Sequence, residues 1–170
     1  MACRRHRCEL PVITEQVHGE EVPLAICQAH YDLALQGIRE FFEGAYEKND
    51  NGCWIWKRGA QQQGYGMVGH RGITTKNPGG GTVPAYQMAL FLTEDNELSL
   101  AEMGQIHHLC GDGRCVNPAH LVELREIMHQ VLHNLENLGI LNVVLDHIAE
   151  IYPKSEDFVK LLRNHILGNE

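Results

Sequence analysis

Six cysteines and eleven histidines occur in this 170-residue chain, and the way they cluster restricts the fold more than any other feature. In a reducing compartment, clustered Cys and His residues indicate zinc more often than disulfides. A structural zinc ion needs four sulfur or nitrogen ligands, commonly two close pairs from separate segments. Two complete ligand sets can be drawn from the sequence, and together they use every cysteine.

The first predicted set lies at the N-terminus. Eighteen residues separate the pair Cys3 and Cys8 from the pair Cys27 and His30, so the set spans 28 residues. The Cys27-x2-His30 pair has the spacing of a zinc knuckle. His6 is an alternative to one thiolate, although Cys is the better zinc donor. The competing interpretation is buried cysteines and surface histidines without metal.

The second predicted set centres on Cys110, Cys115 and His120, which fall within eleven residues. The fourth ligand must come from elsewhere, and Cys53, in the motif GCWIW, is the cysteine that remains. We therefore predict a second zinc site at Cys53, Cys110, Cys115 and His120. A site with four protein ligands has no open position, so both predicted sites are structural rather than catalytic.

Three histidines near the second set have no structural assignment. His107 and His108 are adjacent, so on a strand their side chains point to opposite faces and cannot share one role. His129 follows on a predicted helix, with Arg125 and His133 at positions i−4 and i+4. Any one of the three alone is explained as a surface histidine, whereas the set at this spacing indicates chemistry.

The remaining sequence predicts an α+β fold with four segments: an N-terminal zinc knuckle over 1–32, a linking helix over 33–51, a core over 52–135 and a C-terminal helical extension over 136–170. Apolar periodicity predicts helices over 33–48, from Leu124 to Leu138 with Gly139 as a cap, and over 158–166. Residues 52–92 contain short strand-like runs, a turn at NPGGGT (77–82) and an apolar stretch over 83–92 that suits a short buried helix.

The net charge of −8 is unevenly distributed along the chain. Residues 1–8 carry three arginines and no acid, and residues 52–92 carry four basic residues and no acid. A phosphate-binding surface needs local rather than global positive potential. The candidate DNA contacts are therefore Lys57, Arg58, Arg71 and Lys76, although a neutral stretch of this length also arises by chance. No apolar run is long enough for a membrane span or a signal peptide, which predicts a cytoplasmic protein.

The motifs occur in the order of a known family. Cys27–His30–Tyr31, Gly52–Trp56, Gly64–Tyr65–Gly66 and the core from His108 to Leu121 follow one another. In these residues the chain resembles the HNH, or ββα-metal, endonucleases, and more closely the zinc-bearing phage HNH proteins and the His-Cys box homing endonucleases. The resemblance implies a small zinc-stabilised ββα-metal core in a bacterial or phage-infected cell.

The resemblance also implies roles for individual residues. His108 matches the general base that activates water. His107 and His129 match ligands of a catalytic divalent ion, Mg²⁺ or alternatively Mn²⁺ or Ni²⁺. His120 matches the residue that closes the zinc site, and Asn117 matches the Asn of an Asn-Pro turn that holds the loop together.

One position departs from the family pattern. The segment before the core usually carries a His-Arg pair whose Arg contacts phosphate, and here Tyr86 and Gln87 stand in those places. Either Arg58, Arg71 or Lys76 replaces that Arg, or the enzyme is slow or inactive.

The resulting prediction is a metal-dependent endonuclease that hydrolyses phosphodiester bonds of duplex DNA and leaves 5′-phosphate and 3′-hydroxyl ends. A non-catalytic zinc-stabilised DNA-binding or adaptor protein on the same fold is the first alternative. A protein-interaction zinc module is the second. The C-terminal helices would form a homodimer or partner surface, or complete the core.

Overall fold

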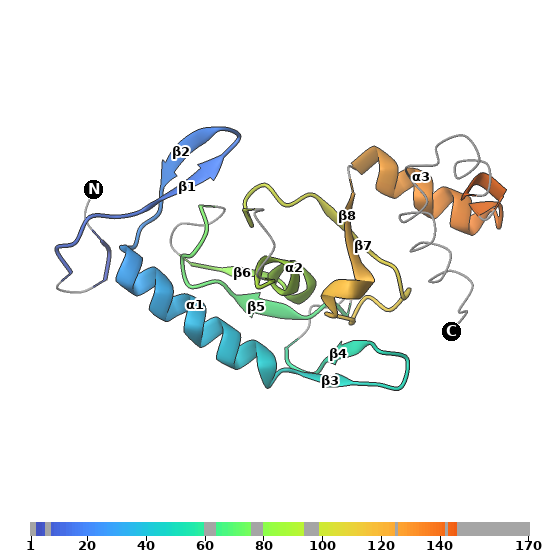
Figure 1. The fold of residues 1–170 in the computed structure, drawn as a ribbon, viewed down its shortest axis with the longest axis horizontal. Coiled ribbons are helices and arrows are strands. Elements are labelled where there is room, and N and C mark those ends of the chain that lie inside the picture. Colours follow the sequence, from blue (N-terminus) through green and yellow to red (C-terminus); the bar gives the residue numbers. More distant parts are fainter. Residues whose placement is uncertain are drawn as a thin grey trace. The chain divides into compact units, whose positions relative to one another are not determined.

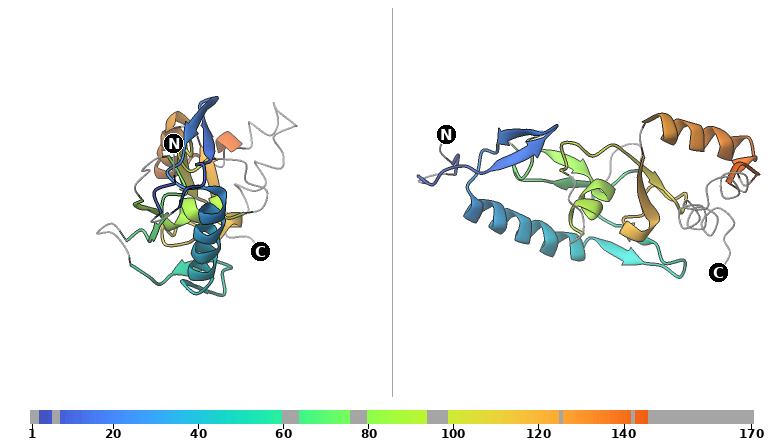
Figure 2. Two further views of the ribbon diagram at one scale, coloured as in Figure 1. Left: turned by 90° about the vertical axis from the view of Figure 1, so that its left-hand side faces the viewer. Right: turned by 45° about the horizontal axis from the view of Figure 1, so that its top comes forward.

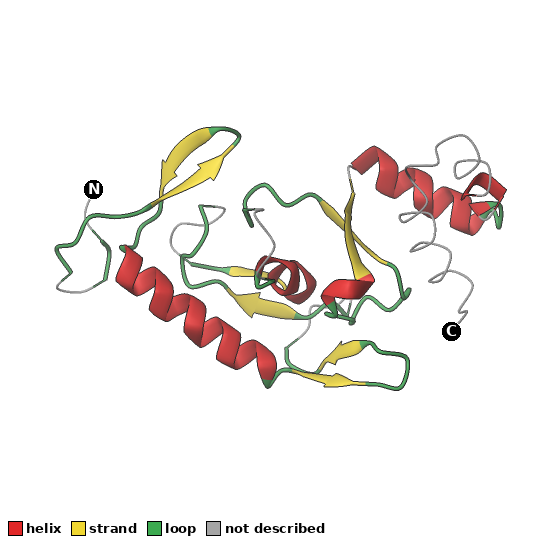
Figure 3. Ribbon diagram, in the orientation of Figure 1, coloured by secondary structure: helices red, strands yellow, loops and turns green. Residues whose placement is uncertain are grey.

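The computed structural model describes residues 3–5, 8–59, 64–75, 80–93, 99–124, 126–141 and 143–145. Over these residues the chain forms short antiparallel hairpins and helices, with two strands in each sheet (Figures 1, 3). The predicted α+β fold class is confirmed. The chain divides into two compact units, residues 1–103 with 113–119, and residues 104–112 with 120–170.

The first unit begins with a tight hairpin beside the start of a long helix (Figures 1, 2). Strands β1 (Thr14–Val17) and β2 (Glu20–Pro23) pair across the turn residues His18 and Gly19, whose φ angles are +52° and +80°. Two consecutive positive φ angles are what a two-residue type I′ hairpin turn requires, which explains a glycine at the second position.

Helix α1 (Gln28–Glu43) begins and ends earlier than the helix predicted over 33–48. Cys27 is extended, with φ −85° and ψ 167°, and so forms the N-cap, while Gly44 ends the helix. Ala34, Ile38 and Phe42 lie four residues apart on one face and are buried, as an amphipathic helix requires. The last predicted helical residues instead form strand β3 (Tyr46–Lys48).

Strand β4 (Trp54–Trp56) pairs with β3 and carries an aromatic cluster. The Tyr46 and Trp54 rings stack at 4.7 Å and 8°, and the Phe42 and Trp56 ring centroids lie 5.3 Å apart. Gly66 packs directly on this cluster, because a Cβ at that position would lie 2.2 Å from Cδ1 of Trp56. The Gly-Tyr-Gly motif therefore has a steric requirement for its second glycine.

The glycine-rich region continues as strands β5 (Met67–Gly69) and β6 (Thr82–Pro84), followed by helix α2 (Ala85–Phe91). The short buried helix predicted over 83–92 is correct from Ala85 onward, and Ala85, Met88 and Ala89 are buried. Val83 differs from the prediction because it pairs with Val68 in the β5–β6 hairpin.

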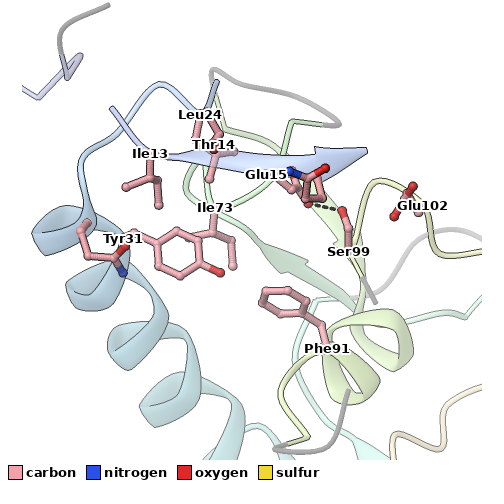
Figure 4. Close-up of a pocket in the computed structure, with 11 residues that line it drawn as sticks. Ile13, Thr14, Glu15, Leu24, Tyr31, Ile73, Phe91, Ser99 and Glu102 are labelled. Atoms are coloured by element: carbon pink, nitrogen blue, oxygen red, sulfur yellow. Dashed lines mark hydrogen bonds between the residues drawn. The ribbon is translucent and has the colours of Figure 1, made fainter. Parts of the chain in front are cut away.

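A cavity of about 390 Å³ lies between β1, α1 and the segments around Ile73 and Ser99 (Figure 4). The Tyr31 ring projects into it from α1. At its rim the Glu15 carboxylate accepts hydrogen bonds from the Thr75 backbone N–H, at 2.6 Å, and from the Ser99 hydroxyl. Glu15 thereby ties the first hairpin to two distant segments of the same unit.

The second unit has the order strand, strand, helix. Strand β7 (Gln105–His108) pairs with β8 (Leu121–Leu124), and helix α3 (Glu126–Asn137) follows. A short 3₁₀ turn, η1 (Pro118–His120), precedes β8. The helix predicted from Leu124 is wrong at its start, because Leu124 pairs with Gln105 in the ladder.

The end of α3 is as predicted. Gly139 has φ +67°, and its N–H donates to the Glu136 carbonyl at 3.0 Å. A left-handed glycine is the usual way to satisfy the last carbonyls of a helix. Beyond it, Leu141 and Leu145 pack with Leu109 and Leu132 in the core of this unit.

Several predicted features lie outside the described residues: His6, Lys76, Arg125, residues 77–79 of the NPGGGT turn and the helix over 158–166. The four predicted domain limits stay a prediction. Among the described helices, none is long and apolar enough to cross a membrane.

We expect the substitution Gly66→Ala to lower the free energy of unfolding by about 1–3 kcal/mol, because the added methyl overpacks against the buried Trp56 ring. Thermal or denaturant unfolding measures the change. Gly59→Ala is the matched control, because a Cβ there meets no atom within 4 Å. Equal stability of the two variants would contradict the steric argument.

Candidate metal centres

The N-terminal Cys/His set converges in the first unit. The ligand atoms of Cys3, Cys8, Cys27 and His30 lie within 4.8 Å of one another. Cys8 Sγ and Cys27 Sγ are 3.7 Å apart, and His30 Nδ1 lies 3.2 Å from Cys27 Sγ and 3.5 Å from Cys3 Sγ. Tetrahedral zinc, with Zn–S of about 2.3 Å, separates two sulfurs by about 3.8 Å and a sulfur and a nitrogen by about 3.6 Å. The set fits structural zinc.

Local backbone structure brings these four side chains together. Cys27 is the N-cap of α1, and His30 lies in its first turn, so the x2 spacing places both at one helix end. The Cys8 N–H donates to the Arg5 carbonyl at 3.0 Å and closes a turn between the other two ligands. The Arg4 N–H donates to the Ala25 carbonyl at 2.9 Å, which fastens this turn beside Cys27.

The environment of Cys3 favours a thiolate. Burial raises the pKa of the Cys3 thiol, but hydrogen bonds from the Arg5 and Cys27 backbone and from the neighbouring thiols outweigh burial and lower the pKa to about 6. A thiolate is the form that binds zinc. The Cys8 and Cys27 sulfurs, 3.7 Å apart, are much farther from each other than the S–S bond length of about 2.05 Å, so these two cysteines do not form a disulfide.

Cys53, Cys110, Cys115 and His120 make up the second set that fits structural zinc by ligand type. Cys53 and Cys115 belong to the first unit, whereas Cys110 and His120 belong to the second. Each pair is held within its own unit by backbone hydrogen bonds.

In the first unit, the segment that carries Cys115 forms backbone hydrogen bonds with β4. The Trp56 N–H donates to the Arg114 carbonyl at 3.0 Å, and the Val116 N–H donates to the Trp54 carbonyl at 2.8 Å. Cys53 precedes this strand directly, and both cysteines are buried. Asn117 adds a side-chain link, since its Nδ2 donates to the Gly52 carbonyl at 2.8 Å and its Oδ1 accepts from the Ala119 N–H at 3.1 Å.

In the second unit, the β7–β8 ladder positions the other pair. The Leu109 N–H donates to the His120 carbonyl at 2.8 Å, one step beyond the paired residues His108 and Leu121. Cys110 therefore directly follows the last residue bonded across the two strands, and His120 is the partner of that residue. The Gly111 N–H donates back to the His108 carbonyl at 3.0 Å and tightens this turn.

A third group, of three histidines, lies within the second unit. One imidazole nitrogen from each of His107, His129 and His133 lies within 4.8 Å of the others. His107 projects from β7, while His129 and His133 lie one turn apart on α3, with their Nε2 atoms 3.2 Å from each other. The Glu136 carboxylate contacts His133 Nδ1 at 3.1 Å and His107 Nε2 at 3.3 Å.

Burial favours the neutral form of His107 and of His129. It is the main cause that lowers the pKa of His107, and the two neighbouring imidazoles lower this pKa further while Glu136 opposes them. Burial followed by the His133 charge lowers the pKa of His129, again against Glu136. A neutral imidazole has the lone pair that a metal ion needs.

Sequence reasoning paired His107 with His129 but gave no role to His133 or Glu136. The signal was present, since His129, His133 and Glu136 are spaced i, i+4 and i+7 and so share one face of a helix. His108, the predicted general base, is next to His107 on β7 and is half-buried. Alternation along the strand directs its side chain to the face opposite that of His107.

The predicted DNA contacts lie in the first unit and are exposed where they are described. Arg71 has a φ of +50°, which is rare for a residue other than glycine. Lys57 forms an ion pair with Glu47 at 2.8 Å, and Arg58 Nη2 donates to the Gly44 carbonyl at 3.4 Å. Tyr86 and Gln87, at the places of the family's His-Arg pair, lie on α2, where Gln87 is buried and Tyr86 contacts the Tyr65 ring at 5.8 Å.

Residues 52–130 match the family described as the zinc-binding loop region of homing endonuclease. The matched segment is slightly less than half of the chain and contains the whole second ligand set together with His107, His108 and His129, but not His133. No curated protein and no solved structure matches the chain. The match supports the resemblance that the motifs of this segment indicated.

We expect the purified protein, after dialysis in metal-free buffer, to retain two zinc ions per chain, one for each Cys/His set. Cys8→Ser and Cys110→Ser should each remove one ion, because each variant breaks a different set, and the double variant should retain none. Mass spectrometry of the metal content gives the count. The control His18→Asn alters an exposed histidine outside both sets. A content of two in either cysteine variant would contradict the assignment.

Proposed function

We propose that this chain, whose residues 52–130 match the zinc-binding loop region of homing endonuclease, is a metal-dependent endonuclease acting on duplex DNA. The observation that carries the proposal is the histidine triad of His107, His129 and His133 in a strand-strand-helix unit. The two Cys/His sets are assigned to structural zinc, which leaves this triad for the chemistry.

The triad fits a divalent ion. His107 is 5% exposed, and its Nδ1 is buried without a hydrogen-bond partner among the described residues. Leaving a buried nitrogen unsatisfied is costly, so a ligand role explains it better than packing does. Three imidazoles suit a transition ion such as Ni²⁺, Mn²⁺ or Zn²⁺ more than Mg²⁺, which prefers oxygen ligands. When bound, the ion would act as a Lewis acid toward the phosphate and the leaving 3′-oxygen.

His108 is proposed as the general base. A neutral imidazole can accept a proton from water near neutral pH, and such a group typically contributes a factor of about 10²–10⁴ to the rate. Its position is well fixed, because the ladder holds it opposite Leu121 and its carbonyl accepts the Gly111 N–H. The zinc loop that begins at Cys110 therefore supports the backbone of the proposed base.

The proposed DNA surface is the acid-free region of the first unit, with Arg71 as its main described contact. Strained backbone conformations cost about 1–3 kcal/mol and cluster at functional sites. The φ of +50° at exposed Arg71 fits such a site. Arg58 is a second proposed contact, whereas Lys57 shares its charge with Glu47. Lys76 remains a proposed contact outside the described residues.

The C-terminal side of the second unit is proposed as a surface for a homodimer or protein partner. Leu138 and Val143 are each 69% exposed. Exposed apolar residues of this kind are typical of interaction surfaces when they are contiguous.

A non-catalytic DNA-binding or adaptor role is the second candidate, and the Tyr86–Gln87 substitution favours it. Neither side chain carries a positive charge, and the burial of Gln87 in α2 keeps it from contacting a phosphate. This candidate predicts salt-dependent DNA binding without strand breakage.

Supercoiled plasmid, incubated separately with Mg²⁺, Mn²⁺, Ni²⁺ and Zn²⁺, tests the proposal. We expect nicking or linearisation with at least one ion, and a loss of about 10²–10⁴-fold in rate for His108→Ala. His18→Asn is the control, because His18 is exposed in the first hairpin and Asn tolerates its positive φ. DNA binding with no cleavage under any ion would select the adaptor role.

We expect Arg71→Asn to weaken binding to duplex DNA and to reduce the slope of log affinity against log salt by about 1, as the loss of one phosphate contact does. Asn is chosen because it keeps the left-handed backbone accessible. Lys48→Gln is the charge-matched control, since Lys48 lies over the Trp54 ring at 4.6 Å. An equal loss in both variants would indicate a non-specific charge effect instead of a contact.

A further inference from the structure

We infer that Glu136 is a positioning residue of the histidine triad, and that its carboxylate sets the tautomer and orientation of His133 and His107 toward a divalent ion. This inference rests on the proposed function, because it assumes that the triad holds an ion. It assigns a role to a residue that the sequence motifs leave without one.

The geometry of Glu136 is that of a bridge between two elements. Its Oε2 lies 3.1 Å from His133 Nδ1 on the same helix, and its Oε1 lies 3.3 Å from His107 Nε2 on β7. The two oxygens of one carboxylate therefore contact two of the three imidazoles. The Glu136 side chain is 30% exposed, so the contacts are partly shielded from water.

The contact with His133 determines which nitrogen of that ring is free. A carboxylate only accepts hydrogen bonds, so Nδ1 of His133 must carry the proton and Nε2 keeps its lone pair. That Nε2 lies 3.2 Å from Nε2 of His129. Two nitrogens bound to one tetrahedral ion at about 2.0–2.1 Å are about 3.3 Å apart, so the two rings already have the spacing of two ligands.

The contact with His107 has the matching effect on the buried ring. Nε2 of His107 donates to Glu136, which leaves the lone pair on Nδ1. This is the nitrogen that is buried without a hydrogen-bond partner among the described residues. Glu136 thus leaves one free lone pair on each of two rings that come from different elements.

Glu136 itself is placed outside the ligand shell. The group of ligand atoms within 4.8 Å of one another contains the three imidazoles and not this carboxylate. Carboxylates that hydrogen-bond the outer nitrogen of a metal-binding histidine raise its basicity and fix its ring, and their loss costs about 10–100-fold in metal affinity. We expect the same factor here.

The test uses the full-length chain with its zinc ions retained and Ni²⁺ as the probe, titrated by calorimetry. We expect Glu136→Gln to weaken Ni²⁺ binding by about 10–100-fold. Glu40→Gln is the control, because it removes the same charge from an exposed position on α1. A change in Glu136→Gln no larger than in the control overturns the inference.

A second measurement separates positioning from simple charge attraction. Long-range ¹H–¹⁵N spectra, recorded without Ni²⁺ at about pH 8, where imidazoles are neutral, report the tautomer of each ring. We expect the proton of His133 on Nδ1 in the native chain and on Nε2 in Glu136→Gln. A native His133 protonated on Nε2 overturns the inference, even if the variant does not fold. So does an unchanged tautomer in a folded variant that has lost Ni²⁺ affinity.

Neither readout depends on cleavage, so failure of this inference is distinguishable from failure of the nuclease proposal. A chain that binds Ni²⁺ through Glu136-oriented rings but never cleaves DNA refutes only the nuclease. Cleavage of plasmid with Ni²⁺ affinity and tautomers unaffected by Glu136→Gln refutes only the positioning role.

Discussion

The β7–β8 ladder determines the placement of His107 and His108 in the second unit. His107 lies opposite Val122 and His108 opposite Leu121, so the alternation of side chains directs the first histidine and not the second toward α3. A register shift of one residue would exchange the two faces. The Leu109 N–H to His120 carbonyl bond extends the same ladder to the pair of Cys110 and His120.

The hairpins that carry these residues are too small to be stable by themselves. Each sheet in the described part of the chain has two strands, and an isolated two-stranded hairpin is at best marginally stable in water. The N-terminal Cys/His set fits a structural zinc that would link Cys3 and Cys8 to the start of α1, and zinc binding of this kind is coupled to folding. The hydrophobic clusters are correspondingly local, such as Leu109, Leu132, Leu141 and Leu145 in the second unit.

The sequence predicted most accurately what depends on short spacings. Cys27 and His30, separated by two residues in the predicted zinc knuckle, both lie at the start of α1. Gly139 lies at the end of α3, as predicted. Errors occurred where two periodicities overlap: Leu124 continues a helical apolar pattern, but it pairs with Gln105, a partner nineteen positions earlier. The same limit hid Glu136, whose contact with His107 exists only because β7 lies against α3. His133 was missed for a different reason, since its i+4 spacing from His129 was visible but had no assigned partner.

The electrostatics of the metal sites bear on how a chain of net charge −8 could bind DNA. A zinc ion with three thiolates and one neutral imidazole carries one net negative charge, so neither structural site attracts phosphate. At the triad, a bound divalent ion would add two positive charges beside the single Glu136 carboxylate. On the proposed function, the ion at the triad therefore provides the positive potential at the site where the phosphodiester bond is cleaved. The arginines of the first unit provide it along the DNA backbone. Binding of the ion to the triad then affects both catalysis and the attraction of the phosphate that is cleaved. The orientation of His107 and His133, which bind the ion, therefore affects substrate binding as well as the reaction.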